Sequence, residues 1–173
     1  GDWSSDVCSS DLDDNTVKLW NRQGKHLKTF SGHNLALTSV AFSYDGQTIA
    51  SASDENTVKR RNLEGKELHT LGHSYLVTSV AFSRDGKAIA SASDDNTVKL
   101  WNLEQKEPLT LTLTRHSKSV NSVAFSQNGQ MIASASDDNT VKLWNHQGKY
   151  LRTLTGHSDD VNSVAFSRDG QTI

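Results

Sequence analysis

The sequence predicts an all-β fold built from copies of one small antiparallel sheet. β-Favouring residues stand in short groups separated by turn signals, without the spacing of an amphipathic helix. The 173-residue chain has one proline and eleven glycines. The segment S-V-A-F-S begins at Ser39, Ser79, Ser122 and Ser163, at intervals of 40, 43 and 41 residues. This repeat organises the prediction, because overlooking one leads to the wrong fold.

Two further segments recur with the same period. D-D-N-T-V-K-L-W begins at Asp13, Asp94 and Asp137, and its counterpart from Asp54 reads D-E-N-T-V-K-R-R. A Gly-His pair precedes three copies of S-V-A-F-S, and Arg115 replaces its glycine in the remaining copy. Three segments in fixed order indicate one structural unit that is repeated along the chain.

Each repeat is predicted to form four strands, as the copy beginning at Gly72 illustrates. The first strand alternates but carries apolar groups on both faces, which is typical of a sheet covered on two sides. Asp85 and Gly86 favour a hairpin turn into the second strand. A sheet this small needs neighbours on both faces to be stable. The expected strands cover residues 77–83, 88–93, 97–101 and 109–114.

These segments resemble those of WD-repeat β-propellers, whose period is about 40 to 45 residues. The resemblance covers residues 13–173 and is closest in character to the tandem repeats of bacterial, particularly cyanobacterial, members. The family's Trp-Asp dipeptide reads Trp-Asn here, as at Trp101 and Asn102. The resemblance implies an all-β propeller of about four blades, each a four-stranded antiparallel sheet. The blades form either a partial propeller or a four-bladed closed ring.

The repeats start and stop within a blade, so we expect the chain to be a fragment of a longer propeller. One alternative is a four-bladed ring closed by combining strands from both ends of the chain. Another is self-association of several chains to complete a ring. The expected divisions are a half repeat over 13–30, full repeats over about 31–71, 72–114 and 115–155, and a partial repeat over 156–173.

Residues 1–12 break the period. Their sequence, G-D-W-S-S-D-V-C-S-S-D-L, resembles a translated sequencing adapter, and we assign no function to Trp3 or Cys8. The alternative is a short strand that substitutes for the missing one. Cys8 is the only cysteine, so no internal disulfide can form, and a reducing, cytoplasmic location is expected.

Composition argues against several classes of partner. The net charge of −2 gives no basic surface for nucleic acid. No apolar run approaches the roughly 18 residues of a membrane-spanning helix. The Asp-Asp-Asn turns lack the spacing of a calcium loop, and no nucleotide-binding motif occurs, so neither metal nor cofactor is expected.

A histidine, an aspartate and a tryptophan recur together, with serines between them. Such a set suggests a nucleophilic triad, but a catalytic site is normally built once, whereas this set repeats. The resemblance implies instead a hydrogen-bonded structural tetrad inside each blade. Its members are His73, Asp95 and Trp101 in one repeat and His116, Asp138 and Trp144 in the next.

The repeat beginning at His33 departs from this pattern. Glu55 replaces the aspartate and Arg61 the tryptophan, so we expect its network to be broken and Arg61 to extend to the rim. Alternatively, Arg60 and Arg61 together grip the phosphate of a phosphopeptide.

The loops after the histidines differ between repeats and should gather on one face. The residues expected to contact partners there are Leu35, Tyr75, Leu76, Lys118 and Asp159. Apolar anchors with a polar rim are typical of protein interfaces. We therefore expect a non-catalytic scaffold that binds other proteins or peptides within a larger regulatory or signalling protein. The alternative is an enzyme with its site in the central channel.

Overall fold

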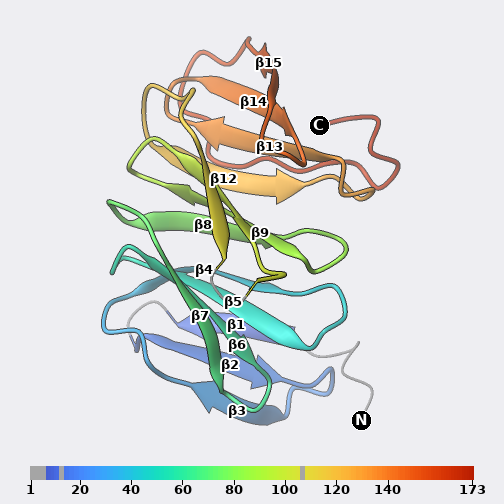
Figure 1. The fold of residues 1–173 in the computed structure, drawn as a ribbon. Helices are drawn as coiled ribbons and strands as arrows, with labels where there is room; N and C mark the ends of the chain where they lie inside the picture. The colour runs from blue at the N-terminus through green and yellow to red at the C-terminus, as the bar shows by residue number, and fades with distance from the viewer. Residues whose placement is uncertain (1–6, 12–13, 106–107) are drawn as a thin grey trace.

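The computed structural model describes residues 7–11, 14–105 and 108–173, which form strands and loops without a helix (Figure 1). The strands are β1 (Val7–Asp11), β2 (Thr16–Trp20), β3 (His26–Phe30), β4 (Leu37–Phe42), β5 (Thr48–Ser53), β6 (Thr57–Asn62), β7 (Glu67–Gly72), β8 (Val77–Phe82), β9 (Ala88–Ser93), β10 (Val98–Asn102), β11 (Leu109–Leu113), β12 (Val120–Phe125), β13 (Met131–Ser136), β14 (Thr140–Asn145) and β15 (Tyr150–Leu154).

The strands form four antiparallel sheets, which we call blades. Blade 1 contains β1–β3, blade 2 contains β4–β7, blade 3 contains β8–β11 and blade 4 contains β12–β15. In blades 2 to 4 each strand pairs with its neighbour in sequence, so every blade is a simple meander. This confirms the predicted all-β fold, and the strands of blade 3 lie within a residue of their expected positions at either end.

The Asp-Asp-Asn turns owe their shape to asparagine. Asn15, Asn56, Asn96 and Asn139 have φ values of 57°, 67°, 67° and 64°, in the left-handed region that asparagine tolerates. Asn96 N–H donates to Ser93 O at 3.2 Å, which closes the tight turn between β9 and β10. One residue type therefore sets the same reversal in each blade.

Residues 7–11 of the leader form a strand despite breaking the repeat. β1 pairs with β2 from Val7↔Trp20 to Asp11↔Thr16, as β5, β9 and β13 pair with the third strands of their blades. Residues 7–11 therefore take the place of a blade's second strand, which is the position that the alternative prediction gave to the leader. Trp3 lies outside the described residues.

Residues 157–173 were expected to form a first strand and its turn. The turn is present, with Ser167 Oγ donating to Asp169 at 2.5 Å, but no strand forms. A strand needs a hydrogen-bonded partner within its sheet, and the described residues of this segment have none. Instead Val161, Val164 and Phe166 pack against β13 and β14 of blade 4.

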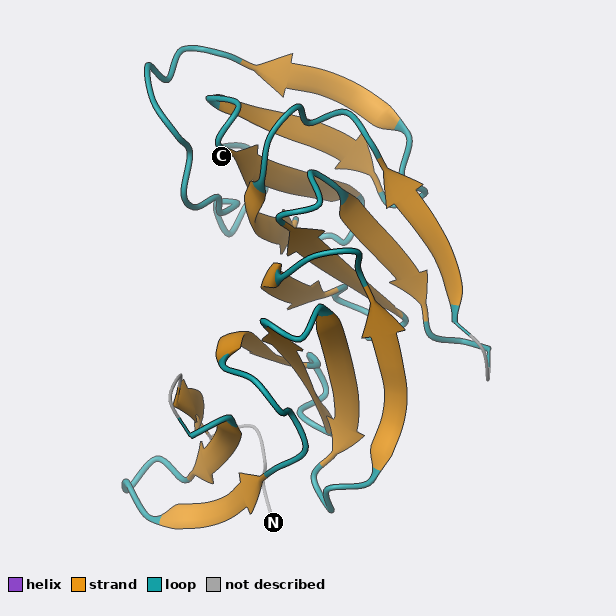
Figure 2. Cartoon of the chain, turned by 90° about the vertical axis from the view of Figure 1, so that its left-hand side faces the viewer, coloured by secondary structure: helices purple, strands orange, loops and turns teal. Residues whose placement is uncertain are grey.

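The blades stack face to face along an open arc, with blades 1 and 4 at its two ends (Figure 2). Among the described residues, β1 pairs only with β2, and residues 157–173 lie against blade 4. The expected alternative of a four-bladed ring closed by strands from both ends is therefore wrong for this structure. The arrangement is that of a partial propeller.

The hydrophobic core lies between blades. Between blades 2 and 3, Val58 and Leu71 pack against Val80 and Trp101, and the Trp101 side chain faces the preceding blade. Small residues such as Ala50 allow this close approach. Each blade therefore buries its apolar faces on its neighbours, as expected for a sheet too small to be stable alone.

The same hydrogen bond, from a valine N–H to a serine hydroxyl, joins blade 2 to blade 3, blade 3 to blade 4, and blade 4 to the segment that follows it. Val80 N–H donates to Ser39 Oγ at 3.2 Å, Val123 N–H to Ser79 Oγ at 3.3 Å, and Val164 N–H to Ser122 Oγ at 3.3 Å. We call these contacts the serine joints. Each serine comes from S-V-A-F-S, so this segment forms the first strand of a blade and also sets the spacing to the next blade.

Candidate functional site

Blade 3 holds a buried network built around His73. The imidazole Nδ1 lies 2.9 Å from Asp95 Oδ2 and Nε2 lies 2.7 Å from Ser91 Oγ, while Trp101 Nε1 donates to the same hydroxyl at 2.8 Å. The His73 side chain is fully buried. Residues from the loop before β8, from β9, from the following turn and from β10 are thereby tied together.

Blade 4 repeats this arrangement around His116. Its Nδ1 lies 2.8 Å from Asp138 Oδ2, its Nε2 lies 2.8 Å from Ser134 Oγ, and Trp144 donates to Ser134 at 3.0 Å. The structure thus brings together the predicted histidine, aspartate and tryptophan in both blades, with a serine from the second strand at the centre.

Blade 2 keeps most of the network that we expected to be broken. His33 Nδ1 lies 2.7 Å from Glu55 Oε1, and His33 Nε2 lies 2.8 Å from Ser51 Oγ. The expectation was wrong because the longer glutamate side chain still reaches the histidine. Among the described residues, blade 2 lacks only the hydrogen bond that tryptophan donates to the central serine in blades 3 and 4, because Arg61 stands at the tryptophan position.

Arg61 was expected to extend to the rim, but it is buried and 5% exposed. Its guanidinium lies in the tryptophan position against blade 1, near Val17 and Phe30. Arg61 Nη2 is 3.5 Å from Glu67 Oε2, which supplies an opposite charge. Pairing with an acidic residue allows the guanidinium to remain inside rather than reach water.

Arg60 and Arg61 do not share a site. Successive residues of a strand point to opposite faces of the sheet. Arg60 Nη1 lies 3.5 Å from His69 Nδ1, whereas Arg61 faces blade 1. The alternative in which both guanidiniums grip one phosphate is therefore wrong.

Burial keeps the network histidines neutral. Burial is the largest influence on the pKa of His73 and lowers it, outweighing the opposite effect of Asp95. Because a carboxylate only accepts hydrogen bonds, His73 Nδ1–H is the donor to Asp95, and Nε2 accepts from the Ser91 hydroxyl. The hydroxyl oxygen in turn accepts the indole N–H, so every member of the network is satisfied.

The carboxylates of the network are ionised. Burial alone would raise the pKa of Asp138, but hydrogen bonds from Thr140, His116 and the Ser117 backbone lower it to about 2. The pKa of Glu55 is likewise lowered to about 2 against the effect of burial. At neutral pH blades 2, 3 and 4 therefore each hold a carboxylate beside an uncharged imidazole.

This geometry resembles a nucleophilic triad, but the hydroxyl is in the wrong place for catalysis. Ser91 and Ser134 are 0% exposed, and both accept an indole N–H. A nucleophile must reach an external substrate and lie beside a base. Buried hydroxyls inside the blades cannot meet the first requirement.

The carboxylates also hold the loops that follow the histidines. The backbone N–H groups of Asn34, Ser74 and Ser117 donate to Glu55, Asp95 and Asp138 at 2.9, 3.0 and 3.1 Å. The network therefore fixes the start of each variable loop as well as the inside of the blade.

Buried serines at the ends of the second strands hold the same loops by their carbonyl groups. Ser53 Oγ donates to Ala36 O at 2.9 Å, Ser93 Oγ to Tyr75 O at 3.1 Å, and Ser136 Oγ to Lys118 O at 3.2 Å. Sequence reasoning considered Ser93 and Ser136 only as alternatives to Ser91 and Ser134 in the histidine set, and it missed their role in holding the loops.

The loops at residues 34–36, 74–76, 117–119 and 158–160 occupy equivalent places, and we call them the loop face. Leu35 and Tyr75 are 51% and 65% exposed. Lys118 and Asp159 are also exposed. Leu76 is only half-buried rather than exposed as expected, because its carbonyl accepts from Asp94 N–H and draws the residue onto the turn.

The chain matches the family described as "WD domain, G-beta repeat" over residues 24–60, 65–102, 107–145 and 148–173. The chain belongs to the WD40 family. The first WD40 match runs from β3 to β6, so a repeat in sequence joins the outer strand of one blade to three strands of the next. A comparison with curated proteins finds no match.

WD40 repeats generally act as scaffolds for protein–protein interactions and are typically not enzymes. The described residues contain no group of three metal-ligating side chains. They also contain no helix with the length and hydropathy needed to cross a bilayer.

Proposed function

We propose that this WD40 chain is a non-catalytic docking scaffold that binds other proteins or peptides through its loop face. The observation that carries the proposal is the double attachment of the variable loops of blades 2 to 4. In blade 3, Asp95 holds the loop at the Ser74 N–H, and Ser93 holds it at the Tyr75 carbonyl. The repeated residues fix the backbone, and the side chains that differ between blades point outward from it.

Such attachment favours binding because the loop is ordered before a partner arrives. Association is weakened by the entropy lost when loops and side chains become fixed. Tyr75 has few rotatable bonds and a ring that is 65% exposed on a backbone held at both ends. A rigid aromatic residue of this kind is a typical interface anchor.

Charged residues on neighbouring loops supply a polar rim. Lys118 lies on the corresponding loop of blade 4, and Asp159 lies on the loop that follows blade 4. Leu35 adds a second apolar position on blade 2. We assign partner contacts to these four residues and place Leu76 beneath them as support. We place this activity in cytoplasmic regulation or signalling.

Photo-crosslinking and capture test the loop face. A photoreactive phenylalanine analogue at position 75 should crosslink a specific set of proteins, and Tyr75→Ala should lose that set in a pull-down. Tyr44→Ala is the matched control, because Tyr44 is 64% exposed but lies in the turn between β4 and β5. Equal capture by both variants, or crosslinking only from position 44, would refute the assignment.

A further inference from the structure

The outer strand of blade 3 contains no lysine, arginine, histidine or acidic residue, unlike the other three outer strands. Lys28, His69 and Arg152 lie opposite residues 19, 60 and 143 of the third strands. The corresponding position in blade 3 is Leu111, opposite residue 100. β11 reads L-T-L-T-L, without a charged residue. Charges on outer strands discourage pairing with other chains, and β11 lacks this protection.

β11 also lacks the bulge that interrupts the other outer strands. The register shifts at Leu19/Trp20 in blade 1, at Arg60/Arg61 in blade 2 and at Leu143/Trp144 in blade 4. In blade 3 the register continues unbroken from Val98↔Leu113 to Asn102↔Leu109. Bulges twist an edge away from partners. β11 therefore presents a regular edge that pairs with no other described strand.

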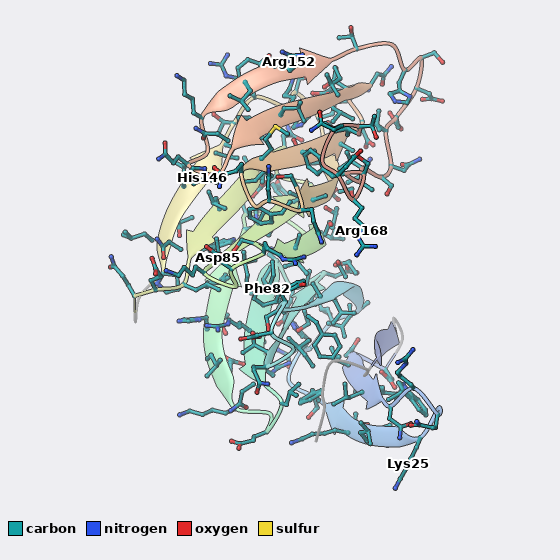
Figure 3. The ribbon with its side chains drawn as sticks, turned by 90° about the vertical axis from the view of Figure 1, so that its right-hand side faces the viewer. Lys25, Phe82, Asp85, His146, Arg152 and Arg168 are labelled. Atoms are coloured by element: carbon teal, nitrogen blue, oxygen red, sulfur yellow. The ribbon has the colours of Figure 1, made fainter. Side chains whose placement is uncertain are left out.

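A pocket of about 640 Å³ lies beside this edge, between blades 3 and 4. Leu109 and Leu111 form one wall and are 59% and 43% exposed, and Phe125 contributes from blade 4. Asp85 and His146, also at the pocket, lie on one side of the molecule in Figure 3. The β8–β9 and β12–β13 hairpin turns line it, so it lies at the opposite end of the blades from the loop face.

The charged groups around the pocket are balanced and engaged with one another. Arg84 and Lys87 are matched by Asp85 and Glu104. Lys87 Nζ lies 2.6 Å from Glu104 Oε1, and the Arg84 guanidinium stacks over the Tyr44 ring at 3.5 Å. Asp85 accepts hydrogen bonds from Ser83 Oγ and from the Lys87 N–H, so each of the four charged groups already has a partner. The complementary ligand is therefore uncharged where it meets β11.

We propose that β11 binds an extended, uncharged peptide segment of a partner protein as a fifth strand of blade 3. Alternate residues of β11 direct their backbone N–H and C=O groups outward, and these groups bond the added strand. Every second side chain of the peptide, aliphatic or β-branched, enters the pocket beside Leu109 and Leu111. This site is separate from the loop face and does not depend on it.

A second copy of this chain is a less suitable occupant. Pairing of two β11 strands would join edges only five residues long, and stable interfaces need about 1,200 Å² or more. A peptide fills both the edge and the pocket.

The test uses the full chain and a fluorescent, capped peptide in which threonine and valine alternate between terminal lysines. Methylating alternate backbone nitrogens leaves one free hydrogen-bonding edge and prevents the peptide from associating with itself. The control peptide carries the same side chains and is methylated at every central nitrogen. Fluorescence anisotropy measures affinity, and hydrogen exchange measures protection of the β11 amides.

The protein variants distinguish strand pairing at the β11 edge from nonspecific hydrophobic binding. Leu111→Lys introduces at β11 the charge present in the other outer strands, and Leu109→Lys tests a more exposed position of the same wall. Leu151→Lys is the matched control, because Leu151 is 45% exposed on β15. Thermal melting checks that each variant folds.

The proposal expects the one-edged peptide to bind wild type and Leu151→Lys alike and to protect β11 from exchange. Affinity should fall at least about tenfold for both β11 variants and for the fully methylated peptide. Equal binding of the two peptides, or no binding, would overturn it. Dimerisation of wild type that Leu111→Lys abolishes, seen by sedimentation, would identify a second copy as the occupant instead. Tyr75→Ala should leave peptide affinity unchanged, which separates this site from the loop face.

Discussion

Removing the central hydroxyl of a blade should weaken the protein by an amount set by the number of polar groups left without partners. Ser91→Ala deprives two buried groups of a partner, His73 Nε2 and Trp101 Nε1. Each buried group left unsatisfied costs about 2 kcal/mol, within a range of about 1 to 3. We therefore expect Ser91→Ala to lower the free energy of unfolding by about 4 kcal/mol.

Blade 2 provides the matched comparison. Ser51 is 1% exposed and meets His33 in the same way, but Arg61 stands where the tryptophan would be. Ser51→Ala should therefore orphan one group and cost about 2 kcal/mol, half the effect of Ser91→Ala.

Urea unfolding followed by tryptophan fluorescence and circular dichroism measures both variants. A double-mutant cycle with Trp101→Phe isolates the indole link and should give a coupling energy of about 1 kcal/mol or more. Equal losses for Ser51→Ala and Ser91→Ala, or a coupling energy near zero, would show that the indole bond does not stabilise the blade.

Three further predictions concern glycine, pH and the replaced tryptophan. Gly148→Ala should destabilise by about 2 to 4 kcal/mol in urea melts because its Cβ would overlap Leu111, whereas Gly24→Ala, at a similar positive φ in open space, should cost about 1. The indole of Arg61→Trp should be overpacked against Phe30, so adding Phe30→Leu should raise the free energy of unfolding by about 1 to 3 kcal/mol. A double variant no more stable than Arg61→Trp would contradict this. The free energy of unfolding should fall as the pH drops below 6.5, by up to about 1.4 kcal/mol per pH unit for each buried histidine. The reason is that burial lowers the pKa of His33, His73 and His116, so the unfolded chain binds protons that the folded chain does not. A flat stability profile between about pH 5 and 7 would refute this contribution.

The repeating part of the fold could be predicted from the sequence because each strand has its own local signal. The hairpin at Asp85 and Gly86, the turn at Asn96 and the alternation over 77–83 all lie where the structure has them. The histidine networks could be predicted in composition as well. Identical residues at a fixed period must occupy equivalent places, and buried imidazole and indole groups need partners.

The substituted positions could not be predicted because their outcome depends on contacts between distant residues. Whether Arg61 reaches water depends on Glu67 of β7 and on the space left beside Phe30 of blade 1. Whether the Glu55 carboxylate reaches His33 depends on the exact position of the turn between β5 and β6 relative to the loop before β4. A single sequence contains no local pattern for either distance.

The strand formed by residues 7–11 also could not be predicted by matching the repeat residue by residue. Residues 7–11 read V-C-S-S-D, and their register against β2 matches that of I-A-S-A-S in β5 against β6. A β-branched residue followed by small residues is enough to complete a blade at the backbone level. Comparison of exact letters conceals this likeness, and comparison of residue size and branching would have revealed it.

Because the serine joints are alike, a single duplication or deletion of a repeat can change the number of blades. Blades 2 and 3, blades 3 and 4, and blade 4 and the segment after it are joined by the same serine hydroxyl and valine N–H, so duplicating or deleting one whole repeat there leaves chemically equivalent junctions on both sides. Evolution can thus lengthen or shorten such an array without new kinds of contact, and protein engineers can graft a repeat carrying a chosen loop at any of these junctions.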